Sequence, residues 1–286
     1  MTIKHILVPT TGVKSSGTVL GTSLLLARLF NAHAEILFIK EDLLTVLPLA
    51  AEGLTGSFAE EMGAKLRGEQ DEEEKVMRQA FDDLLMLHQI DYRENSIPAN
   101  KASASWAAVD GSARDRIISR GIVCDLIVVG RPTDELKSSS LLEAALFGTG
   151  RPMLVSPPEV PATIGENILV GWNRSALSAR AVQSAMPFLE RAREKTIITV
   201  TTGAKLGPSP EDLSLQLAWH GIETRVKEIA PDYRSVGEAL LAEAEDAGSD
   251  LVVIGAYSHG RLRELLMGGV TRHVLGHAEV PVLMVH

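Results

Sequence analysis

The chain has 286 residues, 45% of them hydrophobic, and a formal net charge of −9. This length suits two domains of average size with full cores. The acidic balance argues against a nucleic-acid partner, because binding the nucleic-acid backbone needs a large basic surface. No run reaches the roughly 18 apolar residues that span a membrane, and the opening MTIKHILVP lacks the pattern of a signal sequence. We therefore expect a cytoplasmic protein that binds neither nucleic acid nor membrane.

Two similar segments open the two halves of the chain. ILVPTTGVKSS begins at Ile6 and ILVGWNRSALS begins at Ile168, and a helical pattern follows each of them. Another apolar run comes next in both halves, AEILFI from Ala34 and TIITV from Thr196. Short apolar strands that alternate with amphipathic helices predict βαβ units, and so a parallel sheet in each half.

The first half is expected to carry an insertion within residues 41 to about 89. The opening strands are 162 residues apart, but the DLIVVG run at Asp125 and the DLVVIG run at Asp250 are only 125 apart, so the first half carries 37 extra residues. Part of this insertion has a helical period. The residues predicted on one face of that helix are Val76, Ala80, Leu84 and Leu85. We expect a longer crossover connection with a surface loop; a flap or a partner surface is the alternative.

Helix-start signals and a proline-rich segment organise the rest of the chain. Ser235 and Glu238 have the spacing of a capping box, and Ser112 and Asp115 repeat it in the first half. The segment Pro157–Glu166 breaks the pattern and is typical of a linker. The predicted domains are therefore residues 1–158, which include the insertion, and residues 166–286.

The glycine-rich segment GAYSHGRLRELLMGGVT, Gly255 to Thr271, follows the strand-like run DLVVI. Two interpretations fit it. Backbone N–H groups of such a loop can bind phosphate oxygens, and the N-terminus of a following helix adds a partly positive end. Alternatively, LRELLMGG is a helix closed by a glycine cap, and Arg261 and Arg263 lie in solvent.

The order and spacing of these segments resemble those of a tandem universal stress protein. The resemblance rests on ILVPTTGVKSS and ILVGWNRSALS, on the glycine-rich loop, and on the closing HAEVPVLMVH. It implies an α/β fold of two tandem domains, each a five-stranded parallel sheet with strand order 3-2-1-4-5 and helices on both faces. This fold is Rossmann-like and related to the adenine nucleotide alpha hydrolases. It also implies pairing through the last strands, near Met153–Val155 and Val282–Val285, so that the halves form an internal pseudo-dimer; a further homodimer is optional.

Members of this family that bind ATP share a loop of the form Gly-x2-Gly-x9-Gly-[Ser/Thr]. Gly255 and Gly268 fit its first and third glycines, whereas Ser258 stands at the second, with Gly260 displaced, and Gly269 replaces the hydroxyl residue. Family members also have an acidic residue after the first strand, and Asn173 stands at this position in the second half. The resemblance therefore implies an adenine nucleotide site, with Mg²⁺ if ATP is bound, in the second domain. Its residues are Gly171, Trp172, Asn173, Val200, Gly255, Ser258, Gly260, Gly268, Gly269 and Val270.

The first half is expected to carry a degenerate site. Asp134 and Glu135 lie where phosphate would bind, and like charge repels it. No Walker A, HExxH, CxxC or GxSxG pattern occurs, so neither catalytic residues nor a metal site are predicted, and any ATP hydrolysis would be slow. His273 and His277 share a helix face. A solvated or capping role for these two side chains is favoured over zinc binding.

Two functions follow from these patterns. One is a stress-response regulator or sensor that binds ATP in its second domain. The alternative is a member of the same family that binds no nucleotide and acts through contacts with an unknown protein partner or another small ligand. Cys124 is expected to be an inert core thiol, and Trp106, Trp172 and Trp219 are expected in the core or an interface.

Overall fold

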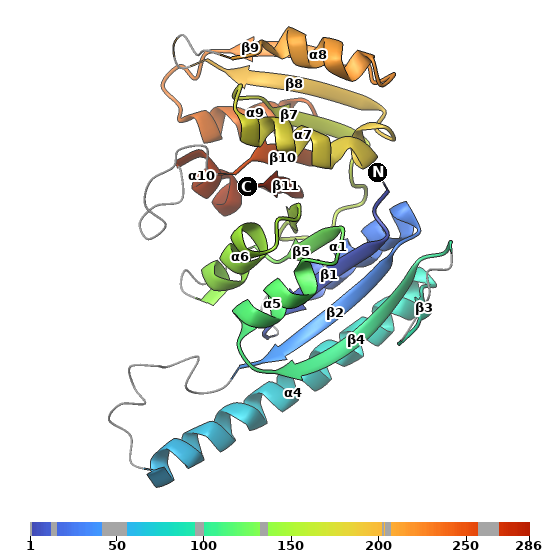
Figure 1. Cartoon of the computed structure of the whole chain (residues 1–286), viewed down its shortest axis with the longest axis vertical. Helices are drawn as coiled ribbons and strands as arrows, with labels where there is room; N and C mark the ends of the chain where they lie inside the picture. Colours follow the sequence, from blue (N-terminus) through green and yellow to red (C-terminus); the bar gives the residue numbers. More distant parts are fainter. Residues whose placement is uncertain are drawn as a thin grey trace. The chain divides into compact units, whose positions relative to one another are not determined.

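A computed structural model describes residues 2–12, 16–41, 56–94, 100–131, 137–201, 203, 207–256 and 269–286. The chain divides into two compact units, Ile3–Arg151 and Pro152–His286. This division falls slightly before the linker predicted from the sequence. Each unit contains one β-sheet with helices packed on it (Figure 1).

The first unit is built on a fully parallel sheet with the strand order β3-β4-β2-β1-β5. Its strands are β1 (His5–Thr10), β2 (His33–Lys40), β3 (Asp91–Tyr92), β4 (Ser103–Asp110) and β5 (Leu126–Val129). Helices α1 (Ser16–Phe30) and α4 (Gly56–His88) pack together, as do α5 (Ala113–Gly121) and α6 (Lys137–Gly148) (Figure 1). Strands β4, β2, β1 and β5 have the predicted order; the two-residue β3 at the edge was not predicted.

The second unit contains β6 (Met153–Val155), β7 (Asn167–Gly171), β8 (Glu194–Val200), β9 (Arg225–Ile229), β10 (Leu251–Gly255) and β11 (Val282–Val285). Its helices are α7 (Ala176–Leu189), α8 (Pro210–Ala218), α9 (Val236–Asp246) and α10 (Gly269–His277). The order β11-β10-β7-β8-β9 is parallel throughout and confirms the predicted order of the second half. Strand β6 pairs antiparallel with β11, with Leu154 opposite Leu283, so the two last strands pair as predicted.

The repeated Asp at the start of the DLIVVG and DLVVIG runs has the same structural role in both units. Asp125 Oδ2 accepts hydrogen bonds from the backbone N–H groups of Lys4 and His5, at 2.8 and 3.0 Å. Asp250 accepts from the backbone N–H groups of Glu166 and Asn167, at 3.1 and 2.8 Å. Each carboxylate thus satisfies donors at the start of the central strand that would otherwise lack partners.

The helix-start signals are confirmed. Ser235 accepts from the backbone N–H of Glu238, and the Glu238 carboxylate accepts from the backbone N–H of Ser235, which completes the capping box of α9. Ser112 caps α5 by accepting from the backbone N–H of Asp115 at 3.4 Å.

The buried face of α4 agrees with the predicted one at Leu85 but not at Val76. Met77, Phe81 and Leu85 are buried, whereas Val76 is 51% exposed. The buried positions follow a spacing of four residues, which keeps one narrow stripe of the helix against the unit. Val76 belongs to the neighbouring stripe and faces solvent.

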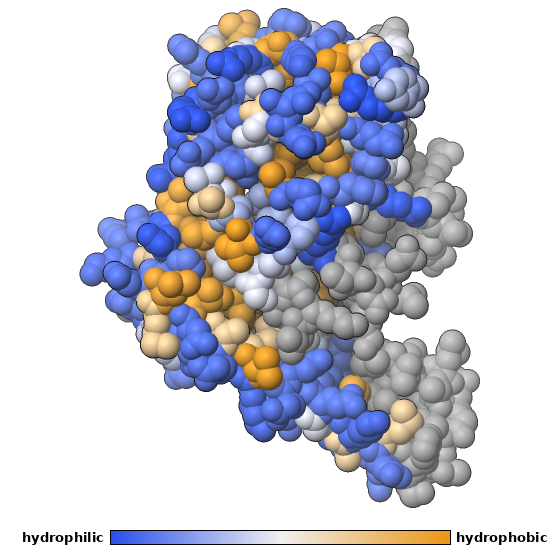
Figure 2. All heavy atoms as spheres, turned by 180° about the vertical axis from the view of Figure 1, so that it is seen from behind, coloured by the Kyte–Doolittle hydropathy of each residue, from blue (hydrophilic) through white to orange (hydrophobic). Residues whose placement is uncertain are grey.

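Of the three tryptophans, only two are buried. Trp106 and Trp172 are 9% and 5% exposed, whereas Trp219 is 81% exposed at the end of α8, which excludes the core for Trp219 and leaves the interface of the prediction untested. Hydrophilic residues cover most of the face shown in Figure 2, with apolar residues in separate groups. Among the described residues, no helix combines the length and apolar composition that a membrane crossing requires.

Candidate functional site

The candidate site lies at the carboxyl ends of β7 and β10 in the second unit. Strand β7 pairs with β8 on one side and with β10 on the other, and Gly171 is opposite both Ile198 and Ile254. The chain leaves β7 toward β8 and later returns to β10, so the strand order reverses between β7 and β10. In open parallel sheets, ligands bind outside the carboxyl ends of the strands at such a switch point.

Gly255 ends β10 directly against the start of α7. A Cβ atom on Gly255 would lie 2.6 Å from the backbone carbon of Leu177 and 2.6 Å from the backbone nitrogen of Ser178. Backbone atoms cannot move aside as a side-chain end can, so helix packing alone requires glycine here. The first glycine of the loop pattern therefore has a structural reason that does not involve phosphate.

The turn after β7 places Trp172 and Asn173 differently. The Trp172 indole is buried and its Nε1–H donates to the carbonyl of Pro208 at 3.0 Å. Asn173 is half-buried, and its Oδ1 accepts from the backbone N–H of Ser175 at 3.2 Å. Ser175 is the N-cap of α7. The Asn173 amide oxygen thus shapes the turn, which reduces its availability to a purine edge.

Arg174 is a further residue of this edge that the sequence did not identify. Its backbone has φ 64, and its guanidinium forms an ion pair with Glu228 of β9, with Nη2 3.0 Å from Oε1. A positive φ is expected from sequence mainly at Gly or Asn, so nothing marked Arg174 in advance. The turn therefore brings a cation to the carboxyl ends of the strands.

The other predicted site residues are dispersed. Val200 ends β8 and is half-buried, and Gly269 and Val270 are exposed at the start of α10. Ser258, Gly260 and Gly268 lie outside the described residues, as do Asp134 and Glu135 of the first half. The structure thus brings Gly171, Trp172, Asn173 and Gly255 to one edge, and the nucleotide site as a whole stays a prediction.

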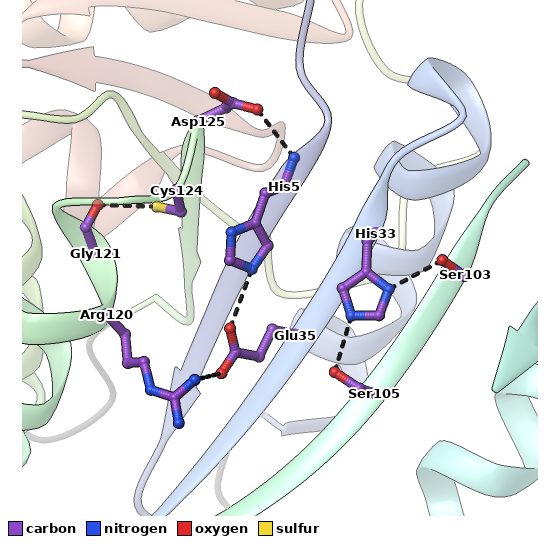
Figure 3. Close-up of polar contacts among 9 residues, drawn as sticks. All are labelled: His5, His33, Glu35, Ser103, Ser105, Arg120, Gly121, Cys124 and Asp125. Atoms are coloured by element: carbon purple, nitrogen blue, oxygen red, sulfur yellow. Dashed lines mark hydrogen bonds and ion pairs between the residues drawn. The ribbon is translucent and has the colours of Figure 1, made fainter. Parts of the chain in front are cut away.

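A second polar cluster lies in the first unit, near the amino ends of β1, β2 and β4 (Figure 3). Glu35 is buried and binds His5 Nε2 through Oε2 at 3.1 Å and Arg120 Nη1 through Oε1 at 2.8 Å. The hydrogen bond with His5 lowers the pKa of Glu35, and the positive charge of Arg120 contributes to this, while burial opposes it. Each oxygen of the buried Glu35 carboxylate thus has a partner, as a buried ion requires.

His33 occupies the neighbouring position of the same cluster. Its Nδ1 and Nε2 lie 2.9 Å from the hydroxyls of Ser103 and Ser105, respectively (Figure 3). Burial lowers the pKa of His33, with a further contribution from His5. A neutral imidazole can bond to both hydroxyls, because it has one donor and one acceptor. This cluster lies at the opposite end of the strands from a switch-point site.

Neither thiol chemistry nor a metal centre has support in the described part of the chain. Cys124 is buried, and burial raises the pKa of its thiol to about 11, which confirms the expected inert core thiol. The rings of His273 and His277 are stacked, with centroids 4.2 Å apart. No group of three or more His, Cys, Asp or Glu with metal-binding geometry occurs among the described residues.

Comparisons with known proteins agree with this fold. The model of the universal stress protein family matches residues 165–286. A curated universal stress protein from Methanocaldococcus jannaschii is 38% identical over 48 residues, which are 17% of this chain and 30% of that protein. The chain therefore matches less than a third of the length of this relative.

Two solved structures resemble nearly the whole chain. A universal stress protein from Archaeoglobus fulgidus DSM 4304 superposes with a TM-score of 0.68 at 17% identity, covering 98% of this chain and 97% of that one. A protein from Pseudomonas aeruginosa UCBPP-PA14, provisionally assigned to the same family, gives a TM-score of 0.56 at 17% identity, covering 99% and 93%. At these identities the likeness establishes the fold of the chain and leaves its ligands undecided.

Proposed function

Because the model of the universal stress protein family matches residues 165–286, we propose that the second unit binds an adenine nucleotide at the carboxyl ends of β7 and β10. Binding of ATP, with Mg²⁺, would make the protein a nucleotide-dependent regulator or sensor in a stress response. No catalytic group is assigned, and any hydrolysis is expected to be slow.

The observation that carries the proposal is the set of groups at the switch point. Gly171 and Gly255 end adjacent strands, α7 begins beside them, and Arg174, which is paired with Glu228, supplies a cation. Backbone N–H groups and a guanidinium are suitable partners for phosphate oxygens. The residues present therefore fit a phosphate-bearing ligand in charge and in chemical type.

Two features favour weak rather than tight binding. Gly269 lacks the hydroxyl of the Ser or Thr in the family's loop, and a hydrogen bond to a charged oxygen contributes roughly 1.5–3 kcal/mol. Its loss corresponds to about one to two powers of ten in affinity. In addition, Arg174 must exchange or share its partner Glu228.

Calorimetric titration with ATP, with GTP and AMP as controls, tests the proposal. We expect weak ATP binding by the native chain and stronger binding by the double variant Ser258→Gly/Gly269→Ser, which restores the loop pattern. Gly276→Ser is a matched control, because Gly276 is an exposed glycine of the same helix, α10. Absence of ATP binding in both the native chain and the double variant contradicts the proposal.

A second candidate is an interaction module of the same family that binds no nucleotide. The packing of Gly255 against Leu177 and Ser178 favours it, because this glycine then needs no ligand to explain it. The exposed Leu215 and Trp219 of the α8 segment give this module an apolar contact surface. Under this candidate, the titrations above show no heat of binding, and changes at Trp219 alter association with a protein partner.

A further inference from the structure

The carboxyl edge of the first sheet corresponds to the candidate site of the second. In the order β4-β2-β1-β5, the switch point lies between β1 and β5, just beyond Thr10. An anionic ligand would meet the turn after β1 and the N-terminus of α5 at this edge. In the first unit, carboxylates of the protein itself occupy both positions.

The turn after β1 lies against Glu73 of α4. A Cβ atom on Gly12 would be 2.9 Å from Glu73 Oε2 and 3.6 Å from Oε1, so the carboxylate borders the backbone of this turn. Met77, one turn further along α4, is buried, and its sulfur accepts from Thr10 Oγ1 at 3.8 Å. The buried stripe of α4 thereby fixes the position of Glu73.

Lys40, the last residue of β2, holds the same turn of α4 on its other side. Its Nζ lies 2.6 Å from Asp71 Oδ1 and 2.7 Å from Glu74 Oε2. The hydrogen bonds with Asp71 and Glu74 raise the pKa of Lys40, so its ammonium stays charged. Trp106 Nε1–H also donates to Glu74 Oε1, at 3.4 Å. The cation that would attract a phosphate at this edge is therefore neutralised by α4.

The N-terminus of α5 is occupied as well. The backbone N–H of Ala113, the first residue of α5, donates to Glu41 Oε1 at 3.2 Å. Gln70 of α4 fixes Glu41 in turn, because its Nε2 donates to the Glu41 carbonyl at 3.0 Å. A helix N-terminus that already binds a carboxylate offers an incoming anion little further stabilisation.

The residues aligned with Gly12 and Glu41 in the second unit are not acidic. From the alignment of Ile6 with Ile168, Arg174 corresponds to Gly12, and Thr201 follows β8 where Glu41 follows β2. At the first edge two carboxylates of α4 surround Lys40 and a third, that of Glu73, borders the turn, whereas at the second edge Arg174 of the turn pairs with the single carboxylate of Glu228.

We propose that the acidic turn of α4, Asp71–Glu74, is a built-in inhibitory contact that closes the carboxyl edge of the first sheet to phosphate-bearing ligands. Lys40 anchors this turn. The insertion therefore blocks the first unit, and its removal would expose Lys40 and the turn at Gly12 to an anion. This inference concerns the first unit alone and holds whether or not the second unit binds a nucleotide.

The test is binding of inorganic pyrophosphate to the full-length chain, followed by hydrogen–deuterium exchange so that the first-unit edge is read separately from the second unit. The triple variant Asp71→Asn/Glu73→Gln/Glu74→Gln should gain saturable protection in peptides covering residues 5–12 and 33–41. We expect its affinity at this edge to be at least about tenfold higher than that of the native chain, because like charges near the anion are removed. Adding Lys40→Met should abolish the gain.

The matched control is Glu60→Gln/Glu61→Gln/Glu69→Gln, which removes the same number of charges from exposed positions of α4. It should behave like the native chain. If the triple variant loses its helical circular dichroism, the isosteric single variant Glu73→Gln decides, with a smaller gain expected. The proposal is overturned if the variants gain no protection at this edge, or if the native chain already binds pyrophosphate there as tightly as the triple variant.

Discussion

Replacing Gly255 by alanine separates the two reasons for a glycine at the end of β10. The added Cβ would meet the backbone of Leu177 and Ser178 at 2.6 Å, so either β10 or the first turn of α7 must shift. Overpacking of this kind costs typically about 1–3 kcal/mol. We expect a value near the upper end, because backbone atoms rather than a flexible side chain are in the way.

Urea unfolding, followed by fluorescence and circular dichroism, measures this cost. With a slope of about 2 kcal/mol per molar urea, a loss of 2–3 kcal/mol lowers the midpoint of the second unit by about 1–1.5 M. Gly276→Ala is the matched control, since a Cβ there meets nothing within 4 Å, and it should be neutral or slightly stabilising. If Gly255→Ala unfolds at the same urea concentration as the control, the packing argument is refuted.

Two further predictions concern the first-unit polar cluster and a helix cap. The pKa of His33 is lowered mainly by burial, and His5, Glu35 and Arg93 are the other groups that act on it. On acidification His33 is therefore protonated first in the unfolded chain, so the stability of the fold decreases as the pH drops below the ordinary pKa of 6.5. The pKa of Glu35 is lowered mainly by the hydrogen bond with His5, so its contribution is present above 4.5 and lost as the pH falls below that value. Urea midpoints of the first unit should therefore decrease from pH 7.5 to 5.5 and again toward pH 4, and a His33→Asn variant with an unchanged slope between pH 7.5 and 5.5 would contradict the role of His33. Ser235→Ala should destabilise the second unit by about 1 kcal/mol through loss of the α9 capping box, and an unfolding midpoint equal to that of the native chain would show that the cap contributes nothing.

The strands and caps were predictable because their signals are local. The apolar runs at Ile6 and Ile168 and the spacing of Ser235 and Glu238 determine local structure whatever lies around them. The buried stripe of α4 could not be predicted in the same way. Val76 and Met77 are both apolar, and only the contact with the rest of the unit selects Met77.

The candidate site was predictable only in part, for a related reason. A glycine at position 255 is compatible with a phosphate loop and with close helix packing, and spacing along the chain does not distinguish them. The contacts of Lys40 with Asp71 and Glu74 join residues more than thirty positions apart, so they depend on the register of α4 against the sheet. Arg174 was missed because its unusual backbone conformation has no sequence signature.

The aspartate contacts at the start of the central strands also determine when each unit can complete its fold during synthesis. The hydrogen bond of His5 can form only after Asp125 is synthesised, 120 residues later. That of Asn167 needs Asp250, which follows only 83 residues later. In equilibrium terms the longer loop costs only about 0.3 kcal/mol more in closure entropy. The two units differ more in the time at which these contacts can form, because the nascent chain emerges at about 5–20 residues per second. The insertion of α4 therefore leaves β1 without its β5 partner on the ribosome for a few seconds longer than β7 is left without β10.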